Sequence, residues 1–243
     1  MEFNICHLYP DLLNVYGDFG NIAVLRYRLE KRGFKVNIHN VSIGNNFESS
    51  LYDIVFFGGG QDYEQAIVSS DLMKNKKDAI KEYIENEGVF LSICGGYQLL
   101  GKYYTTPDGQ KLEGLNILDL YTDPGDTRFI GNTVIYNEDL DHTYVGFENH
   151  SGRTYLGNLK PFGKCIEGYG NNGTDGYEGC IYKNTFGTYF HGPLLSKNPE
   201  LADRLIYLAV SKRQGSCTLE PLDDRLELKA KEIILNRFKA AKN

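Results

Sequence analysis

The sequence predicts an α/β fold: a largely parallel β-sheet with helices on both faces. Four short, nearly continuous apolar runs have the composition of strands that are buried on both faces, namely Phe3–Leu8, Val36–Val41, Ile54–Phe57 and Val89–Ile93. Two segments between them, residues 21–34 and 71–88, place apolar residues near helical spacing and end close to a glycine. Strands that alternate with amphipathic helices are typical of parallel sheets, which carry functional residues at the carboxyl ends of their strands.

The pattern changes after the first hundred residues. From about Leu112 to His191 short strand-like runs are broken by Gly, Asn and Asp, which predicts an antiparallel or loop-rich extension of the sheet. Residues 199–215 and 226–241 return to helical spacing. We therefore expect a single domain over residues 1–243, with C-terminal helices from about residue 198.

Composition excludes several classes of protein. The net charge of −6, with both signs interspersed, provides no basic stripe for nucleic acid. No apolar run reaches the ~20 residues that span a bilayer, and the start of the chain lacks the pattern of a leader peptide, so we expect a cytoplasmic protein. The five cysteines are scattered, without metal-ligand spacing, so neither a disulfide framework nor a metal site is predicted.

Cys94 lies at a predicted turn from strand to helix. It directly follows the apolar run that ends at Ile93, and the segment "GGYQLLG" after it has the pattern of a helix start. Such an elbow holds a nucleophile at the carboxyl edge of a sheet, where Gly95 and Gly96 relieve crowding and the N–H of Gly95 can stabilise an oxyanion. Most free cysteines are small buried side chains, but the elbow favours a catalytic thiol, helped by the helix N-terminus.

A cysteine nucleophile requires a base, and His191 is the strongest candidate. It ends the run "FGTYFHGP", which places its side chain at the end of a strand. His150, in "GFENHSGRT", is the second candidate. For a lone histidine a hydrogen-bonded structural role is the ordinary alternative, so the prediction for His191 depends on Cys94.

A second glycine-rich segment, Gly58–Gly60, follows the strand Ile54–Phe57. Three glycines allow the backbone to approach a ligand closely, and their N–H groups could complete an oxyanion hole with Gly95. The spacing matches neither of the common phosphate-binding loops, so a nucleotide site is not indicated. Because this loop and the Cys94 elbow follow buried strands, we expect them at the same edge of the sheet.

Several separated motifs together resemble one family. "FFGGGQD", "ICGGYQ" and "FHGP", in this order, are similar to class I glutamine amidotransferases; "LYPDLLNVYGDFGNIAVL", "GFENHSGRTYL" and "GYGNN" narrow the resemblance to the cobyric acid synthase-like subgroup. The similarity covers about residues 3–195. It implies a flavodoxin-like glutamine amidotransferase domain, with an antiparallel extension of the sheet, that hydrolyses glutamine.

The resemblance also implies roles for individual residues. Cys94 attacks the side-chain amide of glutamine, and His191 activates the thiol and then protonates the leaving ammonia. Gly60 and Gly95 supply oxyanion donors. Residues expected to hold the substrate are Gln98, Gly59, Asn149 and, for the α-carboxylate, Arg128, with Arg153 as its alternative and Glu148 as a further candidate in the "ENH" run.

Pro193 departs from the pattern of many class I amidotransferases, in which a glutamate two residues after the histidine completes a triad. The subgroup shares this gap. We therefore expect the orienting acid to come from elsewhere, with a partner subunit as one source, and the isolated chain to be a weak glutaminase.

The resemblance finally implies a partner. The chain has no recognisable nucleotide-binding loop, so ATP and Mg²⁺ are expected on a second, Mur-ligase-like synthetase subunit of a heterodimer, which uses the ammonia to amidate the D-glutamate α-carboxyl of lipid II. Alternatives are a synthetase for another acceptor, such as cobyrinate, a cysteine hydrolase or redox protein of the same fold, and a non-catalytic binding module.

Overall fold

A parallel sheet forms the centre of the computed structural model, which describes residues 1–241. Its strand order is β11-β12-β4-β3-β1-β2, and every neighbouring pair is parallel except β11 and β12. The strands are β1 Glu2–Leu8, β2 Lys35–Val41, β3 Ile54–Phe57, β4 Val89–Ile93, β11 Cys180–Tyr182 and β12 Thr185–Thr188. The four strands predicted from apolar runs are thus confirmed.

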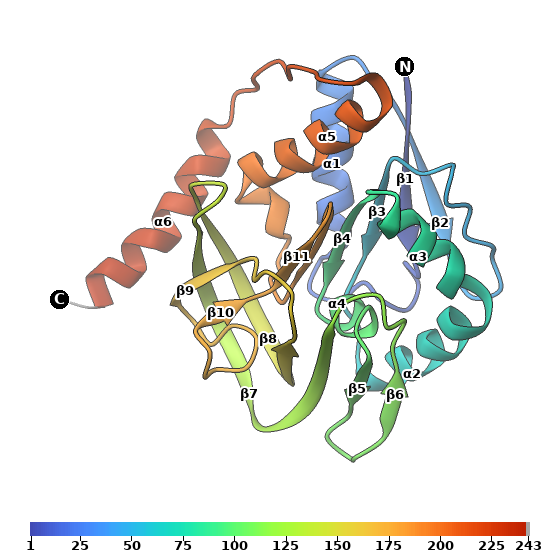
Figure 1. The fold of residues 1–243 in the computed structure, drawn as a ribbon. Coiled ribbons are helices and arrows are strands. Elements are labelled where there is room, and N and C mark those ends of the chain that lie inside the picture. The colour runs from blue at the N-terminus through green and yellow to red at the C-terminus, as the bar shows by residue number, and fades with distance from the viewer. Residues whose placement is uncertain (242–243) are drawn as a thin grey trace.

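Helices cover both faces of this sheet (Figure 1). In the strand order, β2 follows β1 toward one side edge of the sheet, whereas β4 follows β3 toward the other side edge. Because crossovers between parallel strands are right-handed, α1 (Phe19–Lys31) lies on the opposite face from α2 (Asp62–Asp71) and α3 (Lys77–Glu85). Helix α5 (Pro199–Gln214) packs beside α1. The predicted fold class is therefore confirmed.

Helix α2 was not predicted. The structure continues from α2 through a π-helical turn at Leu72–Lys76 into α3, so the helical segment begins nine residues before the predicted one. The reason lies in the buried side of α2, which includes the polar residues Gln65, Ser69 and Asp71. Without apolar periodicity, the sequence pattern that indicates a helix is absent.

A second sheet lies beside the first and is mostly antiparallel, as predicted. Its main feature is a long hairpin of β7 (Leu120–Asn137) and β8 (His142–Leu156), longer than the short strands expected. The other strands are β5 Tyr103–Thr105, β6 Lys111–Glu113, β9 Gly163–Glu167 and β10 Tyr177–Glu178. An isolated bridge joins the two sheets by pairing Phe147 of β8 with His191.

Three further helices complete the described chain: α4 (Gly95–Leu99), a 3-10 turn at Leu194–Ser196, and α6 (Arg225–Ala241). Helix α6 extends to the side of the molecule beyond the second sheet (Figure 1). No helix within residues 1–241 is both long enough and apolar enough to cross a membrane. The loops that follow β1, β3, β4 and β12 meet at the carboxyl edge of the parallel sheet, where functional side chains are expected.

Candidate active site

Cys94 occupies a strained turn between β4 and α4. Its backbone angles, φ 49° and ψ −106°, are unfavourable for a residue with a side chain, and such strain is concentrated at functional sites. Gly96 makes the turn possible, because a Cβ at this position would lie 2.7 Å from the carbonyl oxygen of Phe57. The N–H of Gly96 donates to the oxygen of Gly58 at 3.1 Å. The elbow predicted from the sequence is therefore present.

The structure brings His191 and Cys94 to the same point. A Cβ added to Gly59 would lie 2.8 Å from Cε1 of His191 and 3.1 Å from Cβ of Cys94. The backbone N–H of His191 donates to the oxygen of Phe147 at 2.8 Å, so the second sheet helps to place the histidine. His191 is fully buried and its Nε2 atom has no hydrogen-bond partner in the described chain. This nitrogen remains open to a thiol or a substrate.

Asp18 supplies a carboxylate to His191. Its Oδ1 atom lies 3.1 Å from Nδ1 of His191, and its Oδ2 atom accepts the N–H of Gly59 at 2.9 Å. Both side chains of the pair are fully buried. The acid thus comes from the loop after β1 of this chain, whereas sequence reasoning did not name Asp18 and considered a partner subunit as a source.

The surroundings of His191 favour its protonated form. Burial alone lowers the pKa of a histidine, but the negative charge of Cys94 and the hydrogen bond to Asp18 outweigh burial and raise the pKa of His191 to about 10. An imidazolium held next to a thiol can return a proton to a leaving group. For His150, by contrast, burial dominates and lowers the pKa, so this side chain is neutral near pH 7.

Two backbone N–H groups beside Cys94 are available for an oxyanion. Neither Gly60 nor Gly95 has an acceptor for its N–H in the part of the chain that the structure describes. Both residues lie at the carboxyl edge, one after β3 and one after β4. Gly59, expected to bind substrate, instead uses its N–H to hold Asp18.

A cavity of about 710 Å³ opens in front of Cys94. We call it the carboxyl-edge cavity. Gln98, expected to hold the substrate, lines it and donates from Nε2 to the hydroxyl of Tyr189 at 3.0 Å. Gln65 of α2 also lines it, donates to the oxygen of Gly60, and was missed because α2 itself was missed. The Oε1 atoms of both glutamines are buried without a hydrogen-bond partner among the described residues.

Arg128 lies at the rim of this cavity, in an irregular part of β7. The register of β7 with β8 shifts between Pro124 and Phe129, so the expected loop is a bulge within a strand. Nε and Nη2 of Arg128 donate to the side chain and the backbone oxygen of Asn149. The side chain of Asn149 in turn donates to the hydroxyl of Tyr16 at 2.7 Å. The structure therefore brings Arg128 and Asn149 together at the cavity.

The alternative candidates have structural partners. Arg153 lies over the ring of Phe129 and donates to the carbonyl oxygens of Ser151 and Thr127. The carboxylate of Glu148 accepts two backbone N–H groups, those of Tyr169 and Gly170.

His150 is also held by the protein. Its ring stacks on that of Tyr189 with centroids 3.5 Å apart, and its Nδ1 atom donates to the oxygen of Gly152 at 2.8 Å. His150 nevertheless lines the carboxyl-edge cavity and forms part of its wall.

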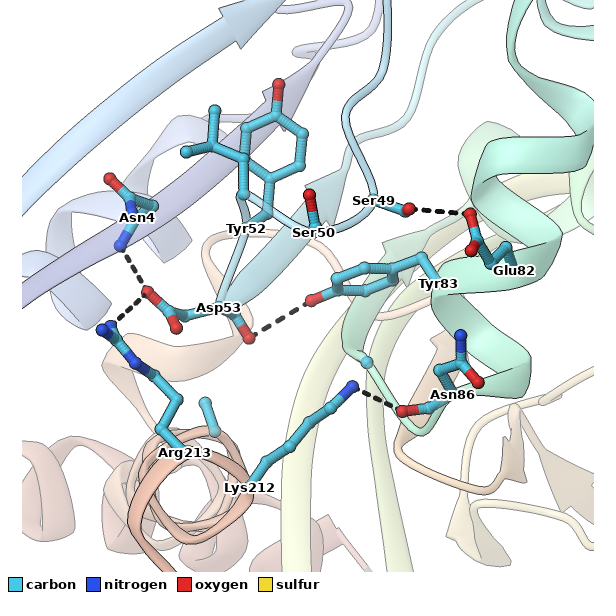
Figure 2. A pocket seen from close by; sticks show the side chains of 13 residues that line it. Asn4, Ser49, Ser50, Tyr52, Asp53, Glu82, Tyr83, Asn86, Lys212 and Arg213 are labelled. Carbon is cyan, nitrogen blue, oxygen red and sulfur yellow. Dashed lines mark hydrogen bonds and ion pairs between the residues drawn. The ribbon is translucent and has the colours of Figure 1, made fainter.

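A second hollow, of about 470 Å³, lies at the opposite edge of the parallel sheet (Figure 2). We call it the amino-edge hollow. Asp53 accepts the backbone N–H of Asn4 and a hydrogen bond from Arg213, while Lys212 donates to the backbone oxygen of Asn86. No buried side-chain nitrogen or oxygen of its described lining lacks a partner. The protein itself therefore pairs the buried side-chain polar atoms of the described lining.

Comparison with known proteins identifies the family. Residues 4–199 match the CobB/CobQ-like glutamine amidotransferase domain. The chain is 51% identical over 216 residues to the lipid II isoglutaminyl synthase (glutamine-hydrolyzing) subunit GatD of Streptococcus pneumoniae, covering 88% of this chain and 83% of that one. It is 45% identical over 236 residues to the subunit of the same name from Staphylococcus aureus, covering 97% and 96%.

The fold is similar to that of a solved structure. The structure of PurLQS from Thermotoga maritima superposes with a TM-score of 0.53 at 15% identity, over 88% of this chain and 100% of that one. The resemblance drawn from the sequence motifs is confirmed by the match to the family and by the two relatives at 51% and 45% identity. This chain therefore belongs to the family of CobB/CobQ-like glutamine amidotransferase domains.

Proposed function

We propose that this chain is the glutaminase subunit of a lipid II isoglutaminyl synthase. It hydrolyses L-glutamine at Cys94 and His191 and delivers ammonia to an ATP-dependent, Mur-ligase-like partner, MurT, which amidates the D-glutamate α-carboxyl of lipid II in peptidoglycan synthesis. The observation that carries the proposal is the strained Cys94 elbow beside a buried His191 that Asp18 holds. The two relatives at 51% and 45% identity support the choice of acceptor.

The geometry supports a two-step hydrolysis. Cys94 attacks the γ-carbonyl carbon of glutamine as a thiolate, its proton having passed beforehand to Nε2 of His191, and the oxyanion is stabilised by the N–H groups of Gly60 and Gly95. Collapse breaks the carbon–nitrogen bond, and His191 returns the proton so that ammonia leaves. Water then attacks the thioester, again with His191 as base, and releases glutamate and the free thiol.

The partner completes the reaction. Amide formation from a carboxylate requires activation, and we assign the ATP and Mg²⁺ that this needs to MurT, because the sequence of this chain has no recognisable nucleotide-binding loop. The proposed heterodimer works in the cytoplasm, at the inner face of the membrane, where its partner meets lipid II. Ammonia that escaped before reaching the acceptor would be lost, so the proposal requires a protected path for ammonia from Cys94 to the partner.

Ammonia release from glutamine tests the first half of the proposal. We expect release that depends on Cys94, is abolished by Cys94→Ala and increases when the Mur-ligase-like partner is co-expressed. Mass spectrometry of lipid II incubated with the complex, glutamine and ATP tests the second half, and one amidation per stem peptide is expected. Release without amidation would favour another acceptor, such as cobyrinate; no release in any combination would contradict the glutaminase assignment.

A further inference from the structure

The charges that line the carboxyl-edge cavity form a complementary pair. Among its lining residues, Asp62 carries the only carboxylate and Arg128 the only guanidinium. Asp62 begins α2 on the parallel sheet, whereas Arg128 belongs to β7 of the second sheet. The cavity therefore presents one negative and one positive side chain to whatever enters it.

The protein holds Asp62 in a fixed position. Its Oδ1 atom accepts the hydroxyl of Tyr104 at 2.7 Å, and Tyr104, on β5, is almost fully buried. Its Oδ2 atom has no partner in the described chain. An acid in the first turn of a helix also interacts favourably with the helix dipole, but Glu64 is in the same turn and does not line the cavity. The helix dipole therefore does not account for the hydrogen bond by which the buried Tyr104, on the second sheet, orients Asp62.

Arg128 is oriented in the same manner. Two of its nitrogens are bound to Asn149, and Nη1 has no partner within residues 1–241. The free atoms of the two side chains are thus one carboxylate oxygen and one guanidinium nitrogen. An α-amino acid carries the matching pair, an ammonium and a carboxylate, on a single carbon.

We propose that Asp62 binds the α-ammonium of the glutamine substrate, opposite the α-carboxylate held by Arg128. This inference rests on the proposed function. Together with the γ-amide at Cys94, it gives the substrate three points of attachment, which selects a free L-amino acid over compounds that carry only the amide. Asp62 is then a specificity residue that touches substrate, and Tyr104 is a positioning residue for it.

Glutaramate tests the proposal, because it is glutamine without the α-amino group. The complex with the partner subunit is prepared as wild type, Asp62→Asn and Glu64→Gln. For each, kcat/KM is measured for L-glutamine and the inhibition constant is measured for glutaramate. Asp62→Asn keeps the shape and an acceptor for Tyr104, and Glu64→Gln controls for charge loss in the first turn of α2. Both quantities are measured on the same preparation of each variant. A fraction of inactive enzyme would lower the apparent kcat of a variant relative to wild type, but it would leave the inhibition constant for glutaramate unchanged.

A hydrogen bond to a charged group contributes about 1.5–3 kcal/mol, so kcat/KM for glutamine is expected to fall roughly 10- to 100-fold in Asp62→Asn. Glutaramate inhibition should change less than about threefold, since there is no ammonium to lose. Glu64→Gln should change neither. Equal weakening of both ligands, or no change in either, overturns the role of Asp62 while the proposed function stands. A wild-type complex that does not hydrolyse glutamine overturns both.

Discussion

The two hollows at opposite edges of the parallel sheet differ in how their polar groups are paired. In the amino-edge hollow, Asp53, Arg213 and Lys212 are bound to other groups of the protein. In and beside the carboxyl-edge cavity, by contrast, Gln65, Gln98 and His191 each keep a buried atom without a partner.

Unpaired buried groups distinguish the carboxyl-edge site from a structural crevice. A buried polar atom without a partner costs about 1–3 kcal/mol, and the Cys94 turn adds backbone strain. At the carboxyl edge, the binding of a ligand can relieve these costs. The amino-edge hollow carries none of these costs, so changes there should affect stability, whereas changes at the carboxyl edge should affect activity.

The largest effect is expected from Asp18→Asn. The N–H of Gly59 must face the new amide oxygen, so the amide NH₂ group faces Nδ1 of His191 and moves the imidazole proton to Nε2. The base is then in the wrong tautomer. We expect kcat for glutamine hydrolysis to fall roughly 100-fold or more, with KM little changed.

The pH profile separates this account from a folding defect. Asp18 raises the pKa of His191, so its loss should move the basic limb of the pH–rate profile to lower pH. Asp11→Asn, at an exposed position in the same loop where the side chain accepts a hydrogen bond from Ser42, is the matched control and should behave as wild type. An Asp18→Asn enzyme with normal kcat and an unmoved basic limb would mean that Asp18 does not orient His191.

Arg128→Met should act on substrate binding. Loss of charged hydrogen bonds to the α-carboxylate is expected to raise KM for glutamine roughly 10- to 100-fold while kcat changes less. Arg26→Met, an exposed arginine on α1 that pairs with Glu30, provides the control. Steady-state kinetics of both variants decide the point, and an unchanged KM for Arg128→Met would assign the carboxylate to another residue.

Arg213→Met extends the test to the amino-edge hollow. It removes hydrogen bonds to Asp53 and to the backbone oxygen of Glu2, in a partly exposed site where such pairs contribute about 1 kcal/mol or less. We expect a small loss of stability in urea unfolding and unchanged glutaminase kinetics. A large loss of activity would show that the amino-edge hollow also contributes to function and would contradict the distinction between the two hollows.

The smallest effect concerns the pH dependence of stability at Asp53. Burial raises the pKa of this carboxyl above its ordinary value, against the opposing hydrogen bond from Asn4 and the charge of Arg213. A raised pKa means that the associated stability is present at acid pH and is lost as pH rises through the pKa in the folded protein.

Asp53→Asn removes this titration. Urea unfolding of both proteins at about pH 4 and pH 7 should show that wild type gains stability relative to the variant on going to the lower pH. A difference between the two proteins that does not vary with pH would contradict the burial argument.

The central strands and the Cys94 elbow could be predicted from the sequence because each depends on a local pattern. A strand buried on both faces requires a continuous apolar run, and the turn at Cys94 requires Gly96 where the backbone meets Phe57. His191 could be selected because a polar side chain directly follows an apolar run. These features need no knowledge of distant contacts.

The missed features depend on contacts between distant residues. Asp18 and His191 are separated by 173 residues, and no spacing connects an acid in an N-terminal loop with a C-terminal histidine. Helix α2 was missed because its buried side includes the polar residues Gln65 and Asp71, so the sequence lacks the apolar periodicity that predicts a helix. The position of Arg128 depends on a register shift between β7 and β8, which exists only once the two strands pair.

Covalent labelling tests the central claim most directly, namely that Cys94 and its neighbours form a glutamine-hydrolysing site. The complex is treated with a diazoketone analogue of glutamine and analysed by intact mass and peptide mapping. The account predicts one adduct, on Cys94, that glutamine prevents and that Asp18→Asn slows. No adduct, or one spread over Cys6, Cys165, Cys180 and Cys217 without protection by glutamine, would contradict it.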